Sequence, residues 1–340
     1  MFIRIRSARC VAAAALALAA AAASAKPQYH LTDLGPSSPT QITGDGTISG
    51  TWYHLVGGNY AGDPALWQGG SWHPLKGGQT TVASGVNRTG AAVGTIGLGE
   101  KSHFHPAAVV WKPAGTRVAI APDAAQSYGF VIRSDGTVYG MLQPPAGHAY
   151  PFSWRAGVVT PLPYFPGWIW TKPFGANKAG EIAATAQDEE QNGVCPAEPV
   201  LFTGGAWVDL GSLGGTCGGA RAVNDAGIVV GLTSVAGSDA GHAFSWQNGV
   251  MTDLGSLGGG YAWADDINAD GVIVGYSADA ALNPHAVVWR SGAIKALDAV
   301  VDQLPDGTMI EAVSINALGQ IVVNGVGHDG QLHTYRLDPL

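Results

Sequence analysis

The sequence predicts an all-β fold, a seven-bladed β-propeller of four-stranded blades in which the N-terminal strand completes the last blade. Three observations predict it. A turn motif and an aromatic position recur in step seven times, short β-rich runs alternate with Asn/Gly turns, and the two ends carry complementary parts of one repeat. A fixed period of this kind is the signature of a repeat architecture. We expect one domain over residues 26–340.

The recurring turn has a Gly that is preceded three residues earlier by a polar residue, usually Asn. Successive turn glycines are 44, 46, 44, 47, 44 and 48 residues apart. The Asn side chain can bond the backbone just ahead of it, and Gly accepts the positive φ of a tight turn, so the motif predicts a hairpin. The seven turns are Thr43 to Gly46, Asn87 to Gly90, Arg133 to Gly136, Asn177 to Gly180, Asn224 to Gly227, Asn268 to Gly271 and Asn316 to Gly319.

A second position keeps step with the turn and is apolar in every copy, with Trp in five of the seven. We expect it on the third strand of each copy, where it would pack in the core. It is occupied by Trp67, Trp111, Trp154, Phe202, Trp246, Trp289 and Leu337.

The two ends of the chain complement each other. The last copy stops after its third strand, residues 333–337, and the chain beyond residue 25 begins with the string 29–35, which resembles the fourth strand at 251–255. An N-terminal strand that completes the last blade would close the ring and protect its edges. An open solenoid does not need this arrangement.

Residues 1–25 read as an export signal. Arg4, Arg6 and Arg9 precede an apolar run over residues 11–23, and Ala23-Ser24-Ala25 forms a small-x-small cleavage site. The run is short for a membrane-spanning helix, and an uncleaved anchor is the alternative. We expect a monomer exported to the periplasm or the extracellular space, with no membrane span after signal removal.

Composition limits the partners. The formal charge is −8, and it becomes −11 once the three signal arginines are removed. A protein of this sign has no electrostatic footprint for nucleic acid or for anionic lipid. Charged residues make up 12% of the chain, hydrophobic residues 46%, and Gly 50 of 340 positions, which favours short strands and tight turns over disorder.

Two cysteines remain beyond the signal, Cys195 and Cys217. In an oxidising compartment a single pair predicts one disulfide. Cys195 falls in the loop between the second and third strands of the fourth copy, and Cys217 in the crossing to the fifth. Two free thiols are the alternative.

The fifth and sixth copies resemble a known repeat family. The string GHAFSWQNGVMTDLGSLGG, preceded by AVNDAGIVVG, is similar to the HAF-type repeat of bacterial extracellular proteins. The resemblance covers nearly all of residues 26–340 and is looser in the other copies. It implies an exported repeat protein without an established activity, and it provides no catalytic residues to transfer.

Strand order assigns the connections to two faces. Turns between strands one and two, and between three and four, share one face, which we call the turn face. The opposite, long-loop face carries the longer and dissimilar connections, which makes it the predicted binding face. These connections are residues 51–63, 95–106, 141–150, 163–173 and 185–198.

Polar and aromatic residues at the start of the innermost strands form the candidate ligand site. The mixture of charges and two Trp rings suits a sugar or another small polar ligand. The alternative is that the charges pair and plug the channel while the Trp rings pack. The candidates are Trp170, Lys172, Arg221, Trp263, Asp265 and Glu311, with Asp266 beside them.

No metal or other cofactor is predicted. His242, His285 and His333 occupy equivalent positions of different copies, too far apart to share one ion, so we expect each to be a hydrogen bonder at the start of a strand. His103, His105 and His148 form a closer cluster. Residues 266–271 resemble the opening of a calcium loop, but Ser277 replaces the expected Glu, which favours a structural turn.

Known enzyme signatures are missing from the sequence, including G-x-S-x-G, H-E-x-x-H and the P-loop. We therefore predict a non-catalytic recognition or scaffold protein that binds a small polar ligand, glycan or protein partner. Aromatic loop residues such as Trp52 and Trp168 would supply rigid contact area. A glycan- or lactone-directed hydrolase or lyase at the channel mouth, using acids among Asp188, Glu189, Glu190, Asp265 and Glu311, is one alternative. A purely structural surface protein is the other.

Overall fold

The computed structural model describes residues 26–57, 59–76, 82–98, 105–113, 115–188, 196–238, 240–304 and 307–340. These residues form β-strands, turns and one 3-10 turn, η2 (Leu297–Ala299). The export signal predicted for residues 1–25 lies outside them. Among the described residues, no helix has the length and apolar character needed to cross a membrane.

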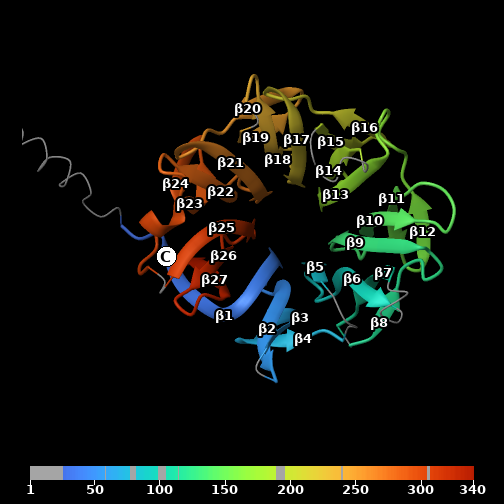
Figure 1. Cartoon of the computed structure of the whole chain (residues 1–340), viewed down its shortest axis with the longest axis horizontal. Helices are drawn as coiled ribbons and strands as arrows, with labels where there is room; N and C mark the ends of the chain where they lie inside the picture. Colours follow the sequence, from blue (N-terminus) through green and yellow to red (C-terminus); the bar gives the residue numbers. More distant parts are fainter. Residues whose placement is uncertain are drawn as a thin grey trace, which may run out of the picture.

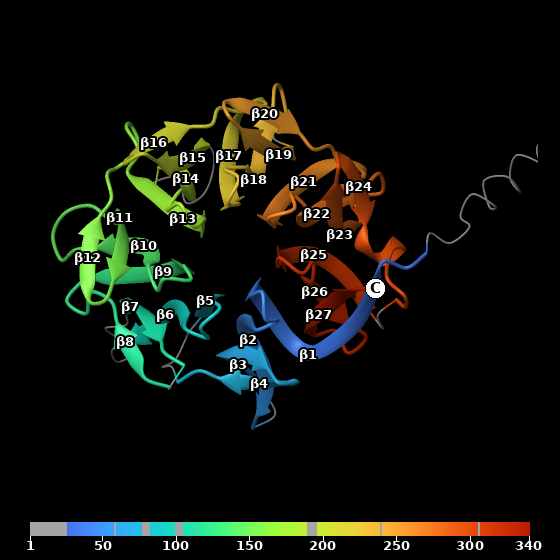
Figure 2. The same ribbon diagram turned by 180° about the vertical axis from the view of Figure 1, so that it is seen from behind.

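The strands form four-stranded antiparallel groups around a central axis (Figures 1 and 2). From the axis outward the strands follow chain order in every group except the last, where β1 comes after β27. The strands nearest the axis are β1 (Tyr29–Ile42), β5 (Val82–Val86), β9 (Gln126–Ile132), β13 (Trp170–Ala176), β17 (Gly214–Val223), β21 (Gly258–Ile267) and β25 (Gly307–Ile315). Second are β2 (Ile48–Val56), β6 (Ala92–Leu98), β10 (Val138–Gln143), β14 (Ile182–Gln187), β18 (Val229–Val235), β22 (Ile273–Asp279) and β26 (Ile321–Gly327).

The outer half of each group completes the pattern. Third strands are β3 (Asn59–Gln68), β7 (His105–Trp111), β11 (Tyr150–Arg155), β15 (Ala197–Thr203), β19 (Gly241–Gln247), β23 (Pro284–Arg290) and β27 (Leu332–Pro339). Outermost are β4 (Ser71–Pro74), β8 (Arg117–Ala119), β12 (Val158–Pro161), β16 (Ala206–Asp209), β20 (Val250–Asp253) and β24 (Ala293–Ala296).

Strand β1 belongs to two groups. Its first half pairs with β27, from Tyr29 opposite Pro339 to Pro36 opposite His333, and so takes the outer position beside the last strand of the chain. Its second half, from Ser37 onward, pairs with β2 as the inner strand of the first group. The predicted pairing of the N-terminal strand with the last repeat is therefore present, and one continuous strand serves both ends of the chain.

The recurring turns have the predicted local geometry. In all seven, the turn Gly has φ between 73° and 87° and donates its N–H to the carbonyl three residues earlier. Asn224 shows the role of the Asn side chain, because its Oδ1 accepts from the N–H groups of Ala226 and Ile228, both at 3.0 Å. The Asn thus caps its own turn.

The same Asn side chains also join neighbouring turns, which the sequence analysis did not foresee. Each Nδ2 donates to the main-chain oxygen of the equivalent residue in the next copy, and the last turn bonds to the first across 273 residues. The donors and acceptors are Asn87 to Arg133 (3.0 Å), Asn177 to Asn224 (3.0 Å), Asn224 to Asn268 (3.1 Å), Asn268 to Asn316 (3.3 Å) and Asn316 to Thr43 (2.8 Å).

Two copies lack the Asn and use other side chains for the same link. Arg133 stands in the third copy, and its Nη2 donates to the main-chain oxygen of Lys178 at 2.7 Å. Thr43 stands in the first copy, where the neighbouring Gln41 accepts the N–H of Val86 through Oε1 at 2.9 Å. Six of the seven turns are therefore bonded to the next turn by a side chain, and for the first copy Gln41 makes a corresponding link from β1 to β5.

The core lies between neighbouring sheets. Trp111 and Trp289, at the recurring aromatic position, are 2% and 1% exposed. Each indole N–H donates to a carbonyl in the connection from the preceding group, Trp111 to Lys76 at 2.7 Å and Trp289 to Leu254 at 3.0 Å. Apolar packing and a directional bond therefore hold adjacent sheets together.

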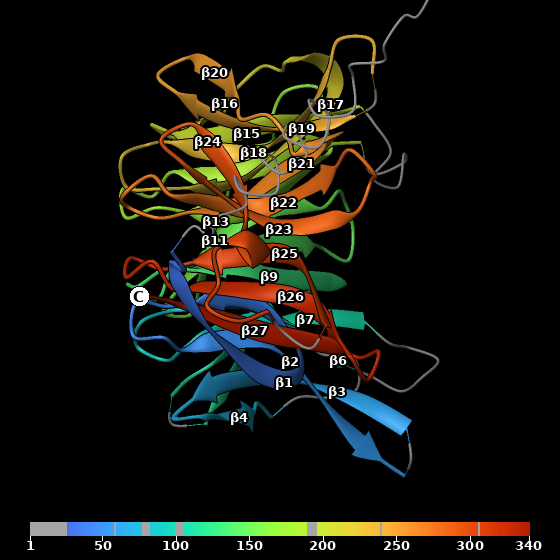
Figure 3. The same cartoon turned by 90° about the vertical axis from the view of Figure 1, so that its left-hand side faces the viewer.

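One predicted loop is a strand pair instead. Residues 51–63 were expected to form a long loop, but β2 and β3 stay paired from Ile48 opposite Trp67 to Val56 opposite Asn59. The hairpin extends beyond the neighbouring strands (Figure 3). The prediction was wrong because backbone pairing can continue outside the sheet, here with the Trp52 and His54 rings stacked at 4.6 Å.

Deleting residues 29–35 from the protein that starts at Lys26 should lower the free energy of unfolding by about 5 kcal/mol or more. The deletion removes Tyr29, Leu31 and Leu34, which are 0%, 5% and 6% exposed, and a fully buried side chain of this size contributes about 1.5–3 kcal/mol. Urea unfolding would measure the loss. His30→Ala is the control, because it removes only an exposed side chain and its surface pair with Asp302, which contributes at most about 1 kcal/mol. Equal stability of the deletion variant and the intact protein would contradict the pairing.

Asn224→Ala should destabilise the protein by about 2–4 kcal/mol, because it removes a turn cap and leaves a buried carbonyl of the neighbouring turn without its donor. Asn224→Asp keeps the accepting oxygen and loses only the donor to Asn268, so it should cost about 1–2 kcal/mol. Urea unfolding of both variants separates the two roles. Wild-type stability of Asn224→Asp would show that the bond between turns contributes nothing.

Candidate functional site

A β-bulge occurs at the same repeat position in each strand next to the axis. Six residues before the turn Gly, one residue of the inner strand has no partner in the ladder with the second strand, and the register shifts by one. A bulge re-aims a side chain without ending the strand pairing. The bulge residues are Thr40, Ser84, Phe130, Phe174, Arg221, Asp265 and Val313.

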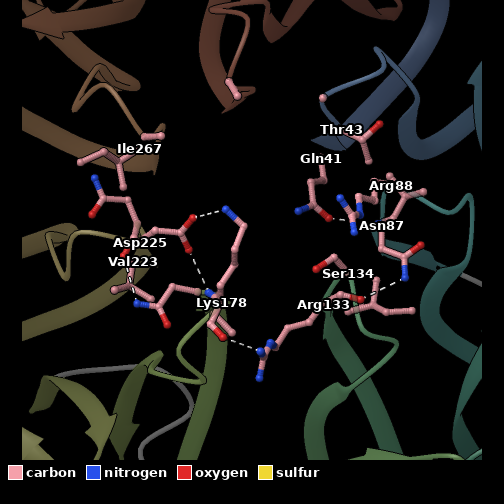
Figure 4. Close-up of a pocket in the computed structure, with 18 residues that line it drawn as sticks. Gln41, Thr43, Asn87, Arg88, Arg133, Ser134, Lys178, Val223, Asp225 and Ile267 are labelled. Carbon is pink, nitrogen blue, oxygen red and sulfur yellow. Dashed lines mark hydrogen bonds and ion pairs between the residues drawn. The ribbon is translucent and has the colours of Figure 1, made fainter.

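All seven bulge residues line one cavity of about 160 Å³ at the axis. A second cavity of about 320 Å³ shares Gln41, Ile132, Ala176 and Val223 with it and is otherwise lined mainly by residues of the turns (Figure 4). We call the two cavities together the axial channel. Its floor is the ring of bulge residues, and its mouth lies on the turn face.

One side of the floor is aromatic and cationic. The Nζ of Lys172 lies 4.8 Å from the ring centroid of Phe130 and 4.9 Å from that of Phe174. The guanidinium carbon of Arg221 lies 4.5 Å from the centroid of Phe174. Ring faces stabilise cations at such distances. Burial, and secondly the nearby Arg221 charge, lower the pKa of Lys172.

The opposite side of the floor is acidic. Burial and then the neighbouring Glu311 carboxylate raise the pKa of Asp265 well above its ordinary value, and the Arg221 charge opposes this only in part. Asp265 is therefore held toward its neutral form. Glu311 accepts a hydrogen bond from Trp263 Nε1 at 2.9 Å, and the Trp263 ring stacks on Tyr276 with centroids 4.0 Å apart.

Two polar atoms of the floor are shielded from solvent without a hydrogen-bond partner among the described residues. They are Nε of Arg221 and Oδ2 of Asp265. Buried polar atoms in folded proteins are nearly always paired. Both atoms belong to residues that line the cavity, so a polar ligand that reached them would supply the missing hydrogen bonds.

The structure places the predicted ligand residues in layers. Arg221 and Asp265 are on the floor, and Lys172, Trp263 and Glu311, each two residues before a bulge position, contact it from the long-loop side. Trp170, at the first residue of β13, lines neither part of the axial channel. Trp263 packs on Tyr276, and Arg221 and Asp265 line a cavity, so ligand binding by these residues stays a prediction.

The remaining floor residues were not among the predicted ligand residues. Phe130 and Phe174 build the aromatic wall, and Thr40 and Ser84 add small hydroxyl groups. Comparing the position six residues before each turn Gly would have collected all of them, because that position holds seven side chains of six different types. The bulge that turns this position toward the axis leaves no mark in the composition.

The calcium-like string at residues 266–271 works as a link between strands. Asp266 accepts from Ser314 Oγ at 2.6 Å and from the Ile315 N–H at 3.0 Å, and Asn268 caps its turn and bonds the next one. These bonds use oxygen atoms of Asp266 and Asn268, two of the three positions that an ion would need. A structural turn therefore accounts for the motif.

The three equivalent histidines are hydrogen bonders, as predicted. Each pairs through Nδ1 with an Asp on the next strand outward: His242 with Asp253 at 2.9 Å, His285 with Asp298 at 3.3 Å and His333 with Asp33 at 2.9 Å. Asp298 lies in η2 rather than in a strand. Asp33 belongs to β1 and occupies in the last group the place that Asp253 occupies in the fifth.

Several predicted features fall partly outside the described residues. His103, Glu189, Glu190 and Cys195 lie there, so the His103, His105 and His148 cluster stays a prediction. Cys217 is disulfide-bonded, and it pairs in parallel with Ala197, two residues beyond Cys195. Residues 77–81, 99–104 and 189–195 belong to connections between strands, so binding at the long-loop face also stays a prediction.

Comparison with solved structures places this geometry in a known fold. A puromycin-hydrolysing peptidase from Mycobacterium tuberculosis superposes with a TM-score of 0.56 at 12% identity over 93% of this chain and 56% of its own. A virginiamycin B lyase from Staphylococcus aureus gives 0.53 at 10% identity over 91% and 99%. The chain has a β-propeller fold.

An acylaminoacyl peptidase gives a TM-score of 0.52 at 11% identity over 86% of this chain and 50% of its own. The β-propeller described here spans about half the length of the two peptidases. No protein-family model matches the sequence, and no curated protein matches it. Identities at this level show the fold alone.

Asp265→Asn should change how stability depends on pH. A carboxyl whose pKa is higher in the folded than in the unfolded protein makes the wild type lose stability as pH rises from 3.8 through the folded-state pKa. The amide does not ionise, so the variant should gain stability relative to wild type between pH 4 and pH 8, measured by urea unfolding. Asp279→Asn is the control: hydrogen bonds from Asn283 lower the pKa of Asp279 to about 2, so this variant should follow the wild-type slope above pH 5. If the free energy of unfolding of Asp265→Asn changed with pH in parallel with that of the wild type, the raised pKa of Asp265 would be contradicted.

Proposed function

We propose that this protein is an exported, closed seven-bladed propeller of HAF-type repeats and a non-catalytic recognition module that takes a small polar ligand in the axial channel. One observation carries the proposal. Seven side chains of six different types, one from each inner strand, converge on a single cavity from a repeat in which the position just before the bulge is always small or apolar and the position two after it is always apolar.

Repeat positions that hold the same kind of residue in every copy serve the framework, and a position that differs between copies can serve recognition. Two residues after each bulge the position is always apolar, and three residues after it the position is Asn in five copies. Those positions repeat because every group needs the same packing and the same turn. The bulge position carries no such requirement, so its side chains are free to form an asymmetric surface on a symmetric scaffold.

Closure and export rest on separate observations. The pairing of β1 with β27 and the bond from Asn316 to Thr43 both join the two ends of the chain, which supports a closed ring of seven groups. The basic, apolar and small-residue segments of residues 1–25 support export to the periplasm or the extracellular space. A bridge between Cys195 and Cys217 would suit either location.

A catalytic role has one supporting observation. Asp265 has a raised pKa beside the Glu311 carboxylate, and such pairs provide the general acid of hydrolases and lyases. Recognition is favoured because Arg221 and the aromatic wall line the same floor as this acid, and because the hydroxyl–carboxylate pair present there, Ser314 with Asp266, is held in the strand link to Ile315. Turnover of glycan or lactone substrates that is lost in Asp265→Asn would establish the enzyme.

A thermal-shift screen of the protein starting at Lys26 against sugars, carboxylates, amines and divalent ions should find a compound that raises Tm, because a ligand that binds only the folded state stabilises it. Ser84→Phe puts a large ring on the floor and should abolish that shift. Thr252→Phe adds the same ring on the exposed outer strand β20 and should leave it unchanged. A shift that survives in Ser84→Phe would place the ligand elsewhere, and the long-loop face would be the next surface to test.

A further inference from the structure

We propose that the ligand of the axial channel is a small organic carboxylate carrying a short apolar group, with Arg221 as its anchor. This inference rests on the proposed function and names the class of ligand. It follows from the distribution of charge in the channel, from the unpaired atoms of the floor and from the apolar wall opposite them.

Basic residues gather on the channel of an otherwise acidic protein. Arg88, Arg133 and Lys178 line the mouth (Figure 4). Arg221 lines the floor, and Lys172 lies beside the same Phe174 ring. These are five of the 17 Lys and Arg residues in a chain of net charge −8. Against these five stand Asp225 at the mouth, Asp265 and Asp266 on the floor and Glu311 beside it, which leaves a formal balance of one positive charge, or two with Asp265 neutral. A channel with this balance concentrates anions at its mouth and speeds their association.

The mouth keeps part of its positive charge after its ion pairs are counted. Lys178 pairs with Asp225, and Arg133 lies 3.6 Å from Asp135. Arg88 is exposed, and no carboxylate of the described chain lies within ion-pair distance of it. An anion that reaches the mouth therefore meets an uncompensated cation before it reaches the floor.

The floor holds two cations that share one aromatic ring. Lys172 and Arg221 lie 4.9 Å and 4.5 Å from the centroid of Phe174, and neither has a carboxylate within 4.0 Å in the described part of the chain. Burial first, and then the charge of Arg221, lower the pKa of Lys172, so the two partly buried cations disfavour each other. An anion bound between the floor and the channel wall would relieve this repulsion.

The hydrogen-bonding groups favour a carboxylate. The unpaired Nε of Arg221 and its neighbouring terminal nitrogen form a fork that matches the two oxygens of a carboxylate. Asp265 is held toward its neutral form, so its carboxyl O–H can donate a hydrogen bond to the bound anion, whereas a charged carboxylate would repel it. Phe130, Phe174 and Val313 leave apolar surface on the same floor for a short chain or ring.

Calorimetric titration with butyrate, benzoate, butyramide, inorganic phosphate and glucose tests the class of ligand. Butyrate or benzoate should bind in a saturable manner, and butyramide, which has nearly the shape of butyrate without its charge, should bind at least about tenfold more weakly. Arg221→Gln should weaken carboxylate binding at least about tenfold, and Lys295→Gln, on the exposed outer strand β24, should not change it.

A second pair of variants covers the case in which Arg221→Gln does not fold. Ser84→Phe fills the floor and should abolish butyrate binding, whereas Arg88→Gln changes only an exposed side chain at the mouth. Arg88→Gln should slow butyrate association about two- to fivefold at low ionic strength, with the difference disappearing at high salt.

The outcomes distinguish the ligand class from the site. If glucose or butyramide binds, carboxylates do not, and Ser84→Phe abolishes that binding, then the axial channel is the binding site but its ligand is not a carboxylate. Binding of phosphate but not of carboxylates, abolished by Ser84→Phe, would lead to the same conclusion. Carboxylate binding that neither Arg221→Gln nor Ser84→Phe affects would overturn both the anchor and the axial site, and so would the absence of binding by every compound.

Discussion

The amide side chain of the turn Asn is the interaction on which the rest of this structure depends. Its oxygen caps the turn that carries it, and its nitrogen bonds the backbone of the neighbouring turn, as Asn224 does with Asn268. Apolar packing between sheets is not directional, so it cannot alone fix how far apart neighbouring turns stand. The Asn bonds set that distance, and hence the width of the axial channel. Where Asn is replaced, Arg133 and Gln41 provide the same kind of link.

The β-bulge separates this framework from the channel surface. Because the bulge residue has no partner in the ladder, its side chain can change without altering the pairing of the inner strand. The position just before it is small or apolar in every copy, as Ala220 is before Arg221, and the position two after it is always apolar, as Val223 is. A repeat that is symmetric in its backbone therefore presents a floor that is aromatic and cationic on one side and acidic on the other.

That floor is a costly arrangement for a folded protein. Lys172 and Arg221 are taken partly out of water without an ion-pair partner, and Asp265 is pushed toward its neutral form beside Glu311. Ring faces compensate the cations only in part. Neutral, packed side chains would fill the axis at lower cost, so the retained charges are consistent with binding. Because the pKa of Asp265 is raised and that of Lys172 is lowered, the stability of the folded protein depends on pH.

The sequence by itself determined the period, the hairpin turns, the pairing of residues 29–35 with the last repeat and the hydrogen-bonding role of the equivalent histidines. Each of these follows from local chemistry repeated along the chain, such as Asn224 capping its own turn. Only the tertiary structure decided that Asn224 also reaches Asn268, that Phe130 and Phe174 face Arg221, and that residues 51–63 extend a hairpin. These features depend on lateral distances between sheets and on a one-residue shift in register. A side chain twelve or more residues away in sequence becomes a neighbour only when the sheets pack, and no local pattern records that distance.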